Sequence, residues 1–230
     1  MLDIDKWLKV LDYKNLESFF RSEKDKGSIG ETVIRVLASS LIYQIPISIL
    51  AIVIMMVGGA AVAGAAGAGL YGAAGIVVML LSIVIGIVLV LVLFFITNGT
   101  QHLIAVALGG KGSYGGLLHL LSFISAISCL VMLPIQGISE LSSVIPVVGA
   151  AVKCLMSIVL LGWLLYSLYA TYLAVKVHYG MTSGRAAAAI ILDILLWVVI
   201  TIIIIVIAVM VLGSMIGTLG GLTSTGLGSY

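Results

Sequence analysis

Charge is what this chain has least of. Its 230 residues include 11 Lys or Arg and 9 Asp or Glu, together 9% of the sequence, whereas soluble domains carry about 25% charged residues. Of these 20 charges, 14 fall within the first 35 positions, which leaves six for the remaining 195. Six charges cannot form a water-facing surface of that size, and 62% of the chain is hydrophobic. We therefore predict an integral membrane protein with a short polar N-terminal region.

Other scarcities exclude further classes of protein. A net charge of +2 provides no basic surface for nucleic acid. The two cysteines, Cys129 and Cys154, lie within apolar runs, which argues against a disulfide scaffold. The three histidines do not share the spacing of a metal site, and no Gly-x-Ser-x-Gly elbow is present. We expect no catalytic, cofactor-binding or metal site, and hence a protein that is not an enzyme.

Apolar runs of about 20 residues, the length needed to span a bilayer, occur five times. We expect an all-α, polytopic bundle with spans at roughly 36–57, 74–97, 116–136, 147–175 and 186–212. Ser28 followed by Glu31 at the third position reads as a capping box, so the first helix should begin before its apolar run. The second helix should continue past its apolar run to Gly109.

Lys and Arg in the short loops predict the orientation. Seven lie in the N-terminal region, and Lys111, Lys176 and Arg185 lie in the loops on the same side. Lys153 alone lies near the opposite face. We expect a multi-pass protein of the cell membrane, with its N-terminus in the cytoplasm and its C-terminus outside.

The polar N-terminal region carries apolar residues at roughly helical spacing, among them Trp7, Leu8 and Phe20. This pattern fits an amphipathic helix in the membrane interface, or one packed under the bundle. The chain thus divides into a cytoplasmic region at 1–27, a five-span domain at 28–212 and a Gly-rich external tail at 213–230. Residues 58–75, almost wholly Gly and Ala, are either a loop or closely packed helical turns.

Glycine-rich turns precede the third and fifth spans. In Gly109-Gly110-Lys111-Gly112-Ser113, Gly112 separates the Lys from the Ser, which excludes a phosphate loop. We expect Gly109 or Gly110 to end the second helix, Lys111 to lie at the headgroups and Ser113 to cap the third helix.

The same turn, together with the segment from His178 and Gly180 to Arg185, resembles the Ypt-interacting protein (Yip) family, with Trp163 in the span before. The resemblance covers about residues 30–212. It implies a five-span fold with the N-terminus inside and, by analogy with eukaryotic members, a possible GTPase partner. The short N-terminal region favours a prokaryotic member.

Asp193 lies about two turns into the fifth span, where an ionisable side chain is costly and is a candidate for function. It could instead be an interfacial carboxylate that pairs with Arg185. We predict that it faces the bundle and has a polar partner at a similar depth. The candidate partners, besides Arg185, are Gln101, His102, His119, Tyr169 and Tyr172.

Two functions remain open at this stage. The first is a non-catalytic membrane scaffold or adaptor, which binds the bilayer and either other membrane proteins or a second copy of itself through small-residue helix faces. The second is a small transporter or channel subunit with a polar site around Asp193. Five spans do not divide into equal repeats, which is atypical of transporters and favours the scaffold.

Overall fold

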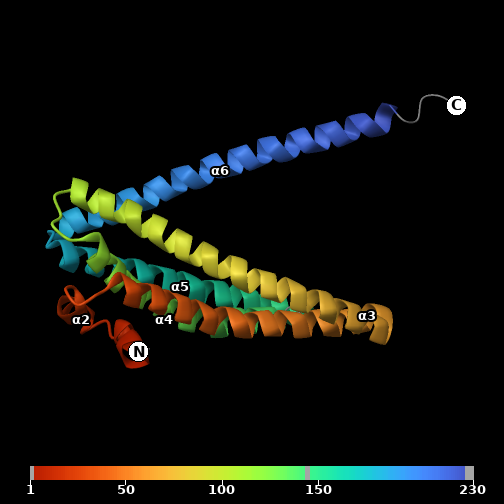
Figure 1. The fold of residues 1–230 in the computed structure, drawn as a ribbon, viewed down its shortest axis with the longest axis horizontal. Coiled ribbons are helices and arrows are strands. Elements are labelled where there is room, and N and C mark those ends of the chain that lie inside the picture. Colours follow the sequence, from red (N-terminus) through yellow and green to blue (C-terminus); the bar gives the residue numbers. More distant parts are fainter. Residues whose placement is uncertain (1–2, 143–145, 226–230) are drawn as a thin grey trace.

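The structure, a computed structural model, describes the backbone of residues 3–142 and 146–225, and the side chains of these ranges apart from 58–72, 146–147 and 212–225. Within this part of the chain every regular element is a helix (Figure 1). The elements are α1 (Ile4–Leu8), a short 3-10 turn η1 (Lys9–Leu11), α2 (Leu16–Glu23), α3 (Ile29–Ala107), α4 (Tyr114–Ser142), α5 (Pro146–Tyr179) and α6 (Ser183–Thr225).

The long element α3 contains the first two spans and folds back on itself between them (Figure 1). A Cβ atom built on Gly75 would lie 3.2 Å from Cγ1 of Ile52, and one built on Gly86 would lie 2.4 Å from Nε2 of Gln44. In a straight helix, a rise of 1.5 Å per residue would separate Ile52 from Gly75 by roughly 35 Å. The two halves of α3 therefore run side by side in opposite directions, and the backbone of the Gly/Ala-rich segment belongs to this helix.

Among the described residues, five helical stretches are long and apolar enough to cross a membrane, as the sequence predicted. They are Ile29–Val57, Ala73–Ala107, Tyr114–Ser142, Val148–Tyr179 and Ser183–Val211. The chain is thus a multi-pass α-helical membrane protein. The helix that contains the fifth span, α6, continues to Thr225, so the Gly-rich tail begins as a helix. No proline or charge interrupts these residues, and isolated glycines weaken a helix without ending it.

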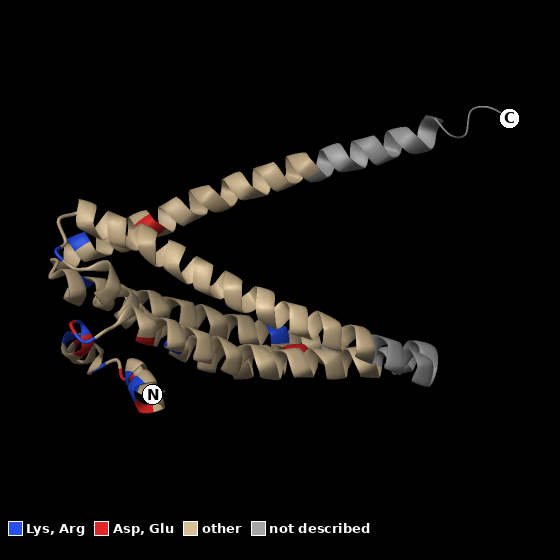
Figure 2. Cartoon of the chain, in the orientation of Figure 1, with Lys and Arg blue, Asp and Glu red and all other residues tan. Residues whose placement is uncertain are grey.

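Buried side chains gather at one end of the bundle, called here the polar end, which comprises α1, η1, α2 and the turns at 108–113 and 180–182. In α4, 61% of the residues in an 18-residue apolar stretch are buried. In the corresponding stretches of Ala73–Ala107 and Ser183–Val211, no residue is buried. Figure 1 shows the reason: α6 and the second half of α3 touch near the polar end and then diverge. The charged residues also concentrate at the polar end (Figure 2).

The N-terminal helices dock on the bundle through their aromatic and aliphatic side chains. Trp7, Val10, Leu16 and Phe20 are each at most 1% exposed, and the ring of Phe19 meets that of Phe123 in α4 edge to face, with 5.2 Å between centroids. The Tyr166 hydroxyl of α5 donates a hydrogen bond to the Val10 carbonyl. One face of this region is thus packed under the bundle. Its other face exposes a second apolar set, Ile4, Leu8, Leu11 and Tyr13, which the interfacial interpretation requires.

The helix ends follow their local sequence signals. The Ser28 hydroxyl accepts a hydrogen bond from the Glu31 backbone N–H at 3.1 Å, so α3 begins where the capping box predicted. Gly109 adopts a φ of 87°, and the Gly110 N–H donates to the Ala105 carbonyl, which closes a Schellman motif. Gly180, with a φ of 61°, ends α5 in the same way. The Ser113 hydroxyl accepts from the Gly116 N–H and caps α4, as predicted.

Candidate functional site at the polar end

The two glycine-rich turns lie against each other. The ring of His178, in the last turn of α5, has its Nε2 2.7 Å from the Ser113 carbonyl oxygen, and the Lys111 backbone N–H donates to the Tyr179 carbonyl at 3.3 Å. Nη1 of Arg185 lies 3.5 Å from the position that a Cβ of Gly109 would occupy. The contacts between the two turns thus hold the start of α4 against the junction of α5 with α6.

Glycine is required where the two turns touch, because no side chain would fit. A Cβ atom on Gly116 would lie 2.2 Å from Cε1 of His178, and one on Gly112 would lie 2.5 Å from its Cδ2. A Cβ on Gly110 would lie 2.8 Å from Cδ1 of Tyr179. All three distances are shorter than van der Waals contact, so the glycines let α4 and the first turn approach the aromatic end of α5 closely.

The end of α3 is joined to the start of α4 and the end of α5 through a histidine and two tyrosines. Nδ1 of His102 lies 2.5 Å from the Tyr179 hydroxyl, and the His102 ring is 5.4 Å from the Tyr114 ring, measured between centroids. The Tyr114 hydroxyl in turn donates to the Phe95 carbonyl at 2.7 Å. Residues from α3, α4 and α5 therefore form one polar and aromatic network, and Gln101 beside it is buried.

A second group joins α2 to α3 and α4 and contains buried charges. Glu23 and His119 are 4% and 2% exposed, and Oε2 of Glu23 lies 3.6 Å from Nε2 of His119. Arg35 Nη1 donates to the His119 carbonyl at 3.2 Å and to the Ser122 hydroxyl at 2.5 Å, and the guanidinium stacks on the Phe123 ring at 3.7 Å. Within the described residues, neither ring nitrogen of His119 has a hydrogen-bond partner.

Glu23 is the carboxylate that holds the N-terminal helices to this group. Burial raises its pKa, but hydrogen bonding to Lys26 and the charges of Lys6 and Lys26, with a smaller contribution from His119, outweigh burial and lower the pKa below 4.5. Oε1 of Glu23 lies 3.6 Å from the Lys6 ammonium and 3.3 Å from that of Lys26. The charged form is therefore the stable one at neutral pH.

Asp193 faces α3, but its partner is not one of those expected. Oδ1 of Asp193 accepts a hydrogen bond from the Thr100 hydroxyl at 2.8 Å, and Nε1 of Trp197 donates to the same hydroxyl at 3.2 Å. The choice of partner was wrong because depth along a helix does not give the rotation of its neighbours. Thr100 lies seven residues before the end of α3, a depth similar to that of Asp193 in α6, so the same criterion would have included it.

The expected partners of Asp193 lie in separate places. His119 belongs to the Glu23 group and His102 to the network around Tyr179, while Gln101 is buried next to His102 in the chain. Tyr169 and Tyr172 stack on each other in α5, with 6.5 Å between ring centroids. The sequence therefore indicated most of the polar residues of this end. It predicted a single cluster, whereas in the structure these residues belong to separate groups.

Chemically, these groups join neighbouring helices through hydrogen bonds, ring contacts and ion pairs. In the part of the chain that the structure describes, no group of three or more His, Cys, Asp or Glu side chains is placed to hold a metal ion. No family model, curated protein or solved structure matches the chain. The resemblance of the two turns to the Yip family therefore stays a prediction.

Proposed function

We propose that this protein is a non-catalytic membrane scaffold that holds other membrane proteins, or a second copy of itself, beside its last helix. The observation that carries the proposal is the divergence of α6 from the second half of α3 (Figure 1). Their apolar residues would be covered by lipid or by a partner, because the chain's own helices do not bury them. The contacts between the two turns hold the start of α6 at the polar end.

The base of this divergence has a polar character that a partner helix could recognise. Thr100, Asp193 and Trp197 meet there, and polar side chains between membrane helices hydrogen-bond across helices. Ile204 lies seven residues after Trp197 and hence on the same face of α6. It is 59% exposed, as expected for a face left open to a partner.

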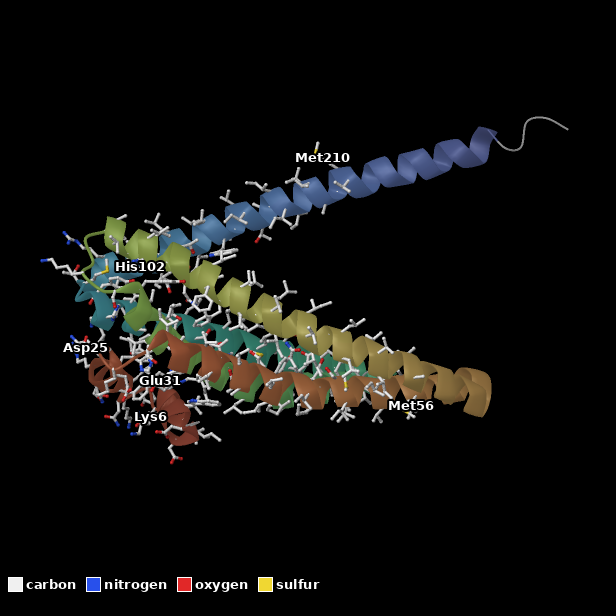
Figure 3. The ribbon with its side chains drawn as sticks, viewed as in Figure 1. Lys6, Asp25, Glu31, Met56, His102 and Met210 are labelled. Carbon is white, nitrogen blue, oxygen red and sulfur yellow. The ribbon has the colours of Figure 1, made fainter. Side chains whose placement is uncertain are left out.

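Photo-crosslinking along α6 in native membranes tests the scaffold directly. A photoreactive amino acid at Ile204 would sit on the face that looks towards α3, whereas one at Met210 sits on the side that points away from the bundle in Figure 3. Both side chains are well exposed, at 59% and 70%, so reach alone does not favour one position. We expect discrete protein adducts, or a dimer of this chain, from position 204 and mainly lipid adducts from position 210. Lipid adducts alone at both positions would exclude the scaffold in this form.

A transporter or channel subunit with a site around Asp193 is the second candidate. The observation in its favour is the cluster of Asp193 with Thr100 and Trp197 within two of the spans. If this function holds, the pure protein in liposomes should conduct an ion or solute, and Asp193→Asn should abolish the flux. Absence of flux together with crosslinks from position 204 would favour the scaffold.

A further inference from the structure

An open cleft of about 670 Å³ lies between α1 and the start of α3, at the polar end. Its charged lining consists of Asp3, Asp5 and Lys6 from the α1 region and Glu31 and Arg35 from α3. Figure 3 shows Lys6 on α1 and Glu31 at the base of α3. The cleft thus presents three carboxylates and two cations to one space, and neither the turns nor the Asp193 group takes part in it.

In the part of the chain that the structure describes, the three carboxylates of the cleft do not pair with its two cations, and the Lys6 ammonium instead lies 3.6 Å from Oε1 of Glu23, which is not part of the lining. Among the described residues, none of the three carboxylates lies within 4.0 Å of the Arg35 guanidinium or of the Lys6 ammonium, although Glu31 and Asp3 act on Arg35 electrostatically. Arg35 makes its two hydrogen bonds through Nη1 alone, towards His119 and Ser122. Facing charges of both signs that are held apart across a cleft suit a ligand that itself carries both charges, with an anion for Arg35 and an ammonium for the carboxylates.

The apolar part of the lining indicates where such a ligand comes from. Ile4 and Ile34 line the cleft and are 48% and 59% exposed, and Trp7, which is 1% exposed, also belongs to the lining. Arg35 lies six residues, or roughly 9 Å, into the helix that forms the first span. A cleft that combines a charged interior with exposed apolar sides at the beginning of a span fits a molecule at the membrane–water interface.

We propose that this cleft binds the headgroup of a zwitterionic phospholipid with a primary amine, as in phosphatidylethanolamine. Arg35 binds the phosphate, and Asp5, Glu31 and Asp3 accept hydrogen bonds from the ammonium. Ile4 and Ile34 contact the start of the acyl chains. This site is separate from the face of α6 in the proposed function, so either can fail without the other.

The charge balance of the cleft separates this lipid from two alternatives. An anionic lipid such as phosphatidylglycerol would place no cation against three carboxylates, which disfavours it. Phosphatidylcholine has the same charges, but its trimethylated nitrogen cannot donate hydrogen bonds to carboxylates. Since hydrogen bonds between charged groups are the strong ones, the primary amine should bind more tightly.

Native mass spectrometry of the full chain in mild detergent, titrated with each of the three lipids, tests the site. We expect phosphatidylethanolamine to bind about five- to tenfold more tightly than phosphatidylcholine. The double variant Asp5→Asn/Glu31→Gln should remove this preference while leaving phosphatidylcholine binding unchanged, and neither side chain forms an ion pair that the fold needs within the described residues. Arg35→Gln should weaken both lipids. Arg21→Gln, which breaks an exposed pair with Glu17 outside the cleft, should change neither.

Arg35 also contacts α4, so the Arg35→Gln result counts only if that variant melts at the same temperature as the wild type. If it does not, the lipid preference of Asp5→Asn/Glu31→Gln decides the test. Equal binding of the amine and choline lipids by the wild type would overturn the proposal, as would tighter binding of phosphatidylglycerol. A preference that survives in Asp5→Asn/Glu31→Gln would place the lipid elsewhere. If soluble phosphoethanolamine displaces the lipid at equal concentration, the ligand is the free headgroup compound and the lipid assignment is wrong.

Discussion

Single atoms decide whether the two turns of the polar end can meet. Three glycines lie where the aromatic end of α5 approaches α4 and the turn before it, and each would place a Cβ atom inside the van der Waals radius of His178 or Tyr179. Side chains of that end, including Tyr179 at 3% exposure, are packed from several directions and have little room to move away. The contact between the two turns therefore depends on the absence of a Cβ atom at each of these three positions.

Gly116→Ala tests this dependence. The new methyl group would lie 2.2 Å from Cε1 of His178, so the ring must move and lose its contact with the Ser113 carbonyl. We expect a loss of about 1–3 kcal/mol of stability, as for other overpacked sites, measured as a lower melting temperature in detergent. Gly137→Ala in the same helix is the matched control, because nothing lies within 4 Å of its Cβ position. Equal melting of the two variants would show that the turns are not packed as described.

At the scale of elements, the N-terminal helices are held by apolar packing and by one buried carboxylate. Trp7 and Phe20 supply the packing, while Glu23 connects α2 to the Lys6 and Lys26 ammonium groups and faces His119. Arg35 of α3 joins the same place, because its Nη1 donates a hydrogen bond to the His119 carbonyl. Charged side chains of α1, α2 and α3 therefore converge on this junction beside His119 of α4, which makes its docking dependent on pH.

The direction of that dependence follows from the lowered pKa of Glu23. A carboxylate with a folded pKa below 4.5 stabilises docking fully above pH 4.5, and this contribution is lost as the pH falls through the folded pKa. Hydrogen exchange of residues 3–27 should therefore be slow at pH 7 and become faster, after correction for intrinsic rates, below pH 4.5. Glu23→Gln should exchange faster at pH 7, by about 1–3 kcal/mol of local stability, and show a weaker pH dependence.

The exposed carboxylate of Asp25, which forms no ion pair within the described residues, provides the control. Asp25→Asn should leave both the rate at pH 7 and its pH dependence close to the wild type. If Glu23→Gln kept the full pH dependence, the effect would belong to other groups, such as Glu17, whose pKa is also lowered, by Arg21 and Lys176.

The attachment of α6 to α3 rests on few polar atoms. Thr100→Val keeps the shape of the side chain but removes the donor to Asp193 and the acceptor for Trp197. We expect a loss of about 0.5–2 kcal/mol, since hydrogen bonds between membrane helices average well below those of a dry interior. Thr97→Val is matched in chemistry, because among the described residues the Thr97 hydroxyl donates only to carbonyls of its own helix, those of Leu93 and Phe94. Identical stability of the two variants in detergent would mean that the Asp193 contact does not hold α6.

For the whole molecule, the asymmetry of charge predicts how the bundle lies in the membrane. Ten of eleven Lys and Arg residues belong to the N-terminal region and to the turn and helix ends that the fold brings to the same polar end. In a variant without Cys129 and Cys154, a cysteine at position 65 should react with an impermeant maleimide added outside cells. A cysteine at the exposed Thr182 should react only after the membrane is opened. Reaction of both from one side would refute this topology.

The number of spans, the helix ends and the membrane location were predictable from the sequence alone. Each depends on a local property: summed hydropathy over about 20 residues for a span, and glycine or serine at a helix end for Gly109, Gly180, Ser28 and Ser113. Local signals also singled out the two turns, although nothing in them states that His178 would meet Ser113. The end of α6 was not predictable in this way, because no proline or charge follows its apolar run.

What only the tertiary structure decided is which faces of the helices meet. Spans that are apolar all round carry no stripe to mark an inward side, so the rotation of α3 that points Thr100 at Asp193 cannot be read from hydropathy. The union of Glu23 with His119, 96 positions apart, and the opposing charges of the cleft also arise only when α1 and α2 fold under the bundle. Sequence determines the elements of this protein because they form through neighbouring residues. Packing determines its sites because they join residues that are distant along the chain.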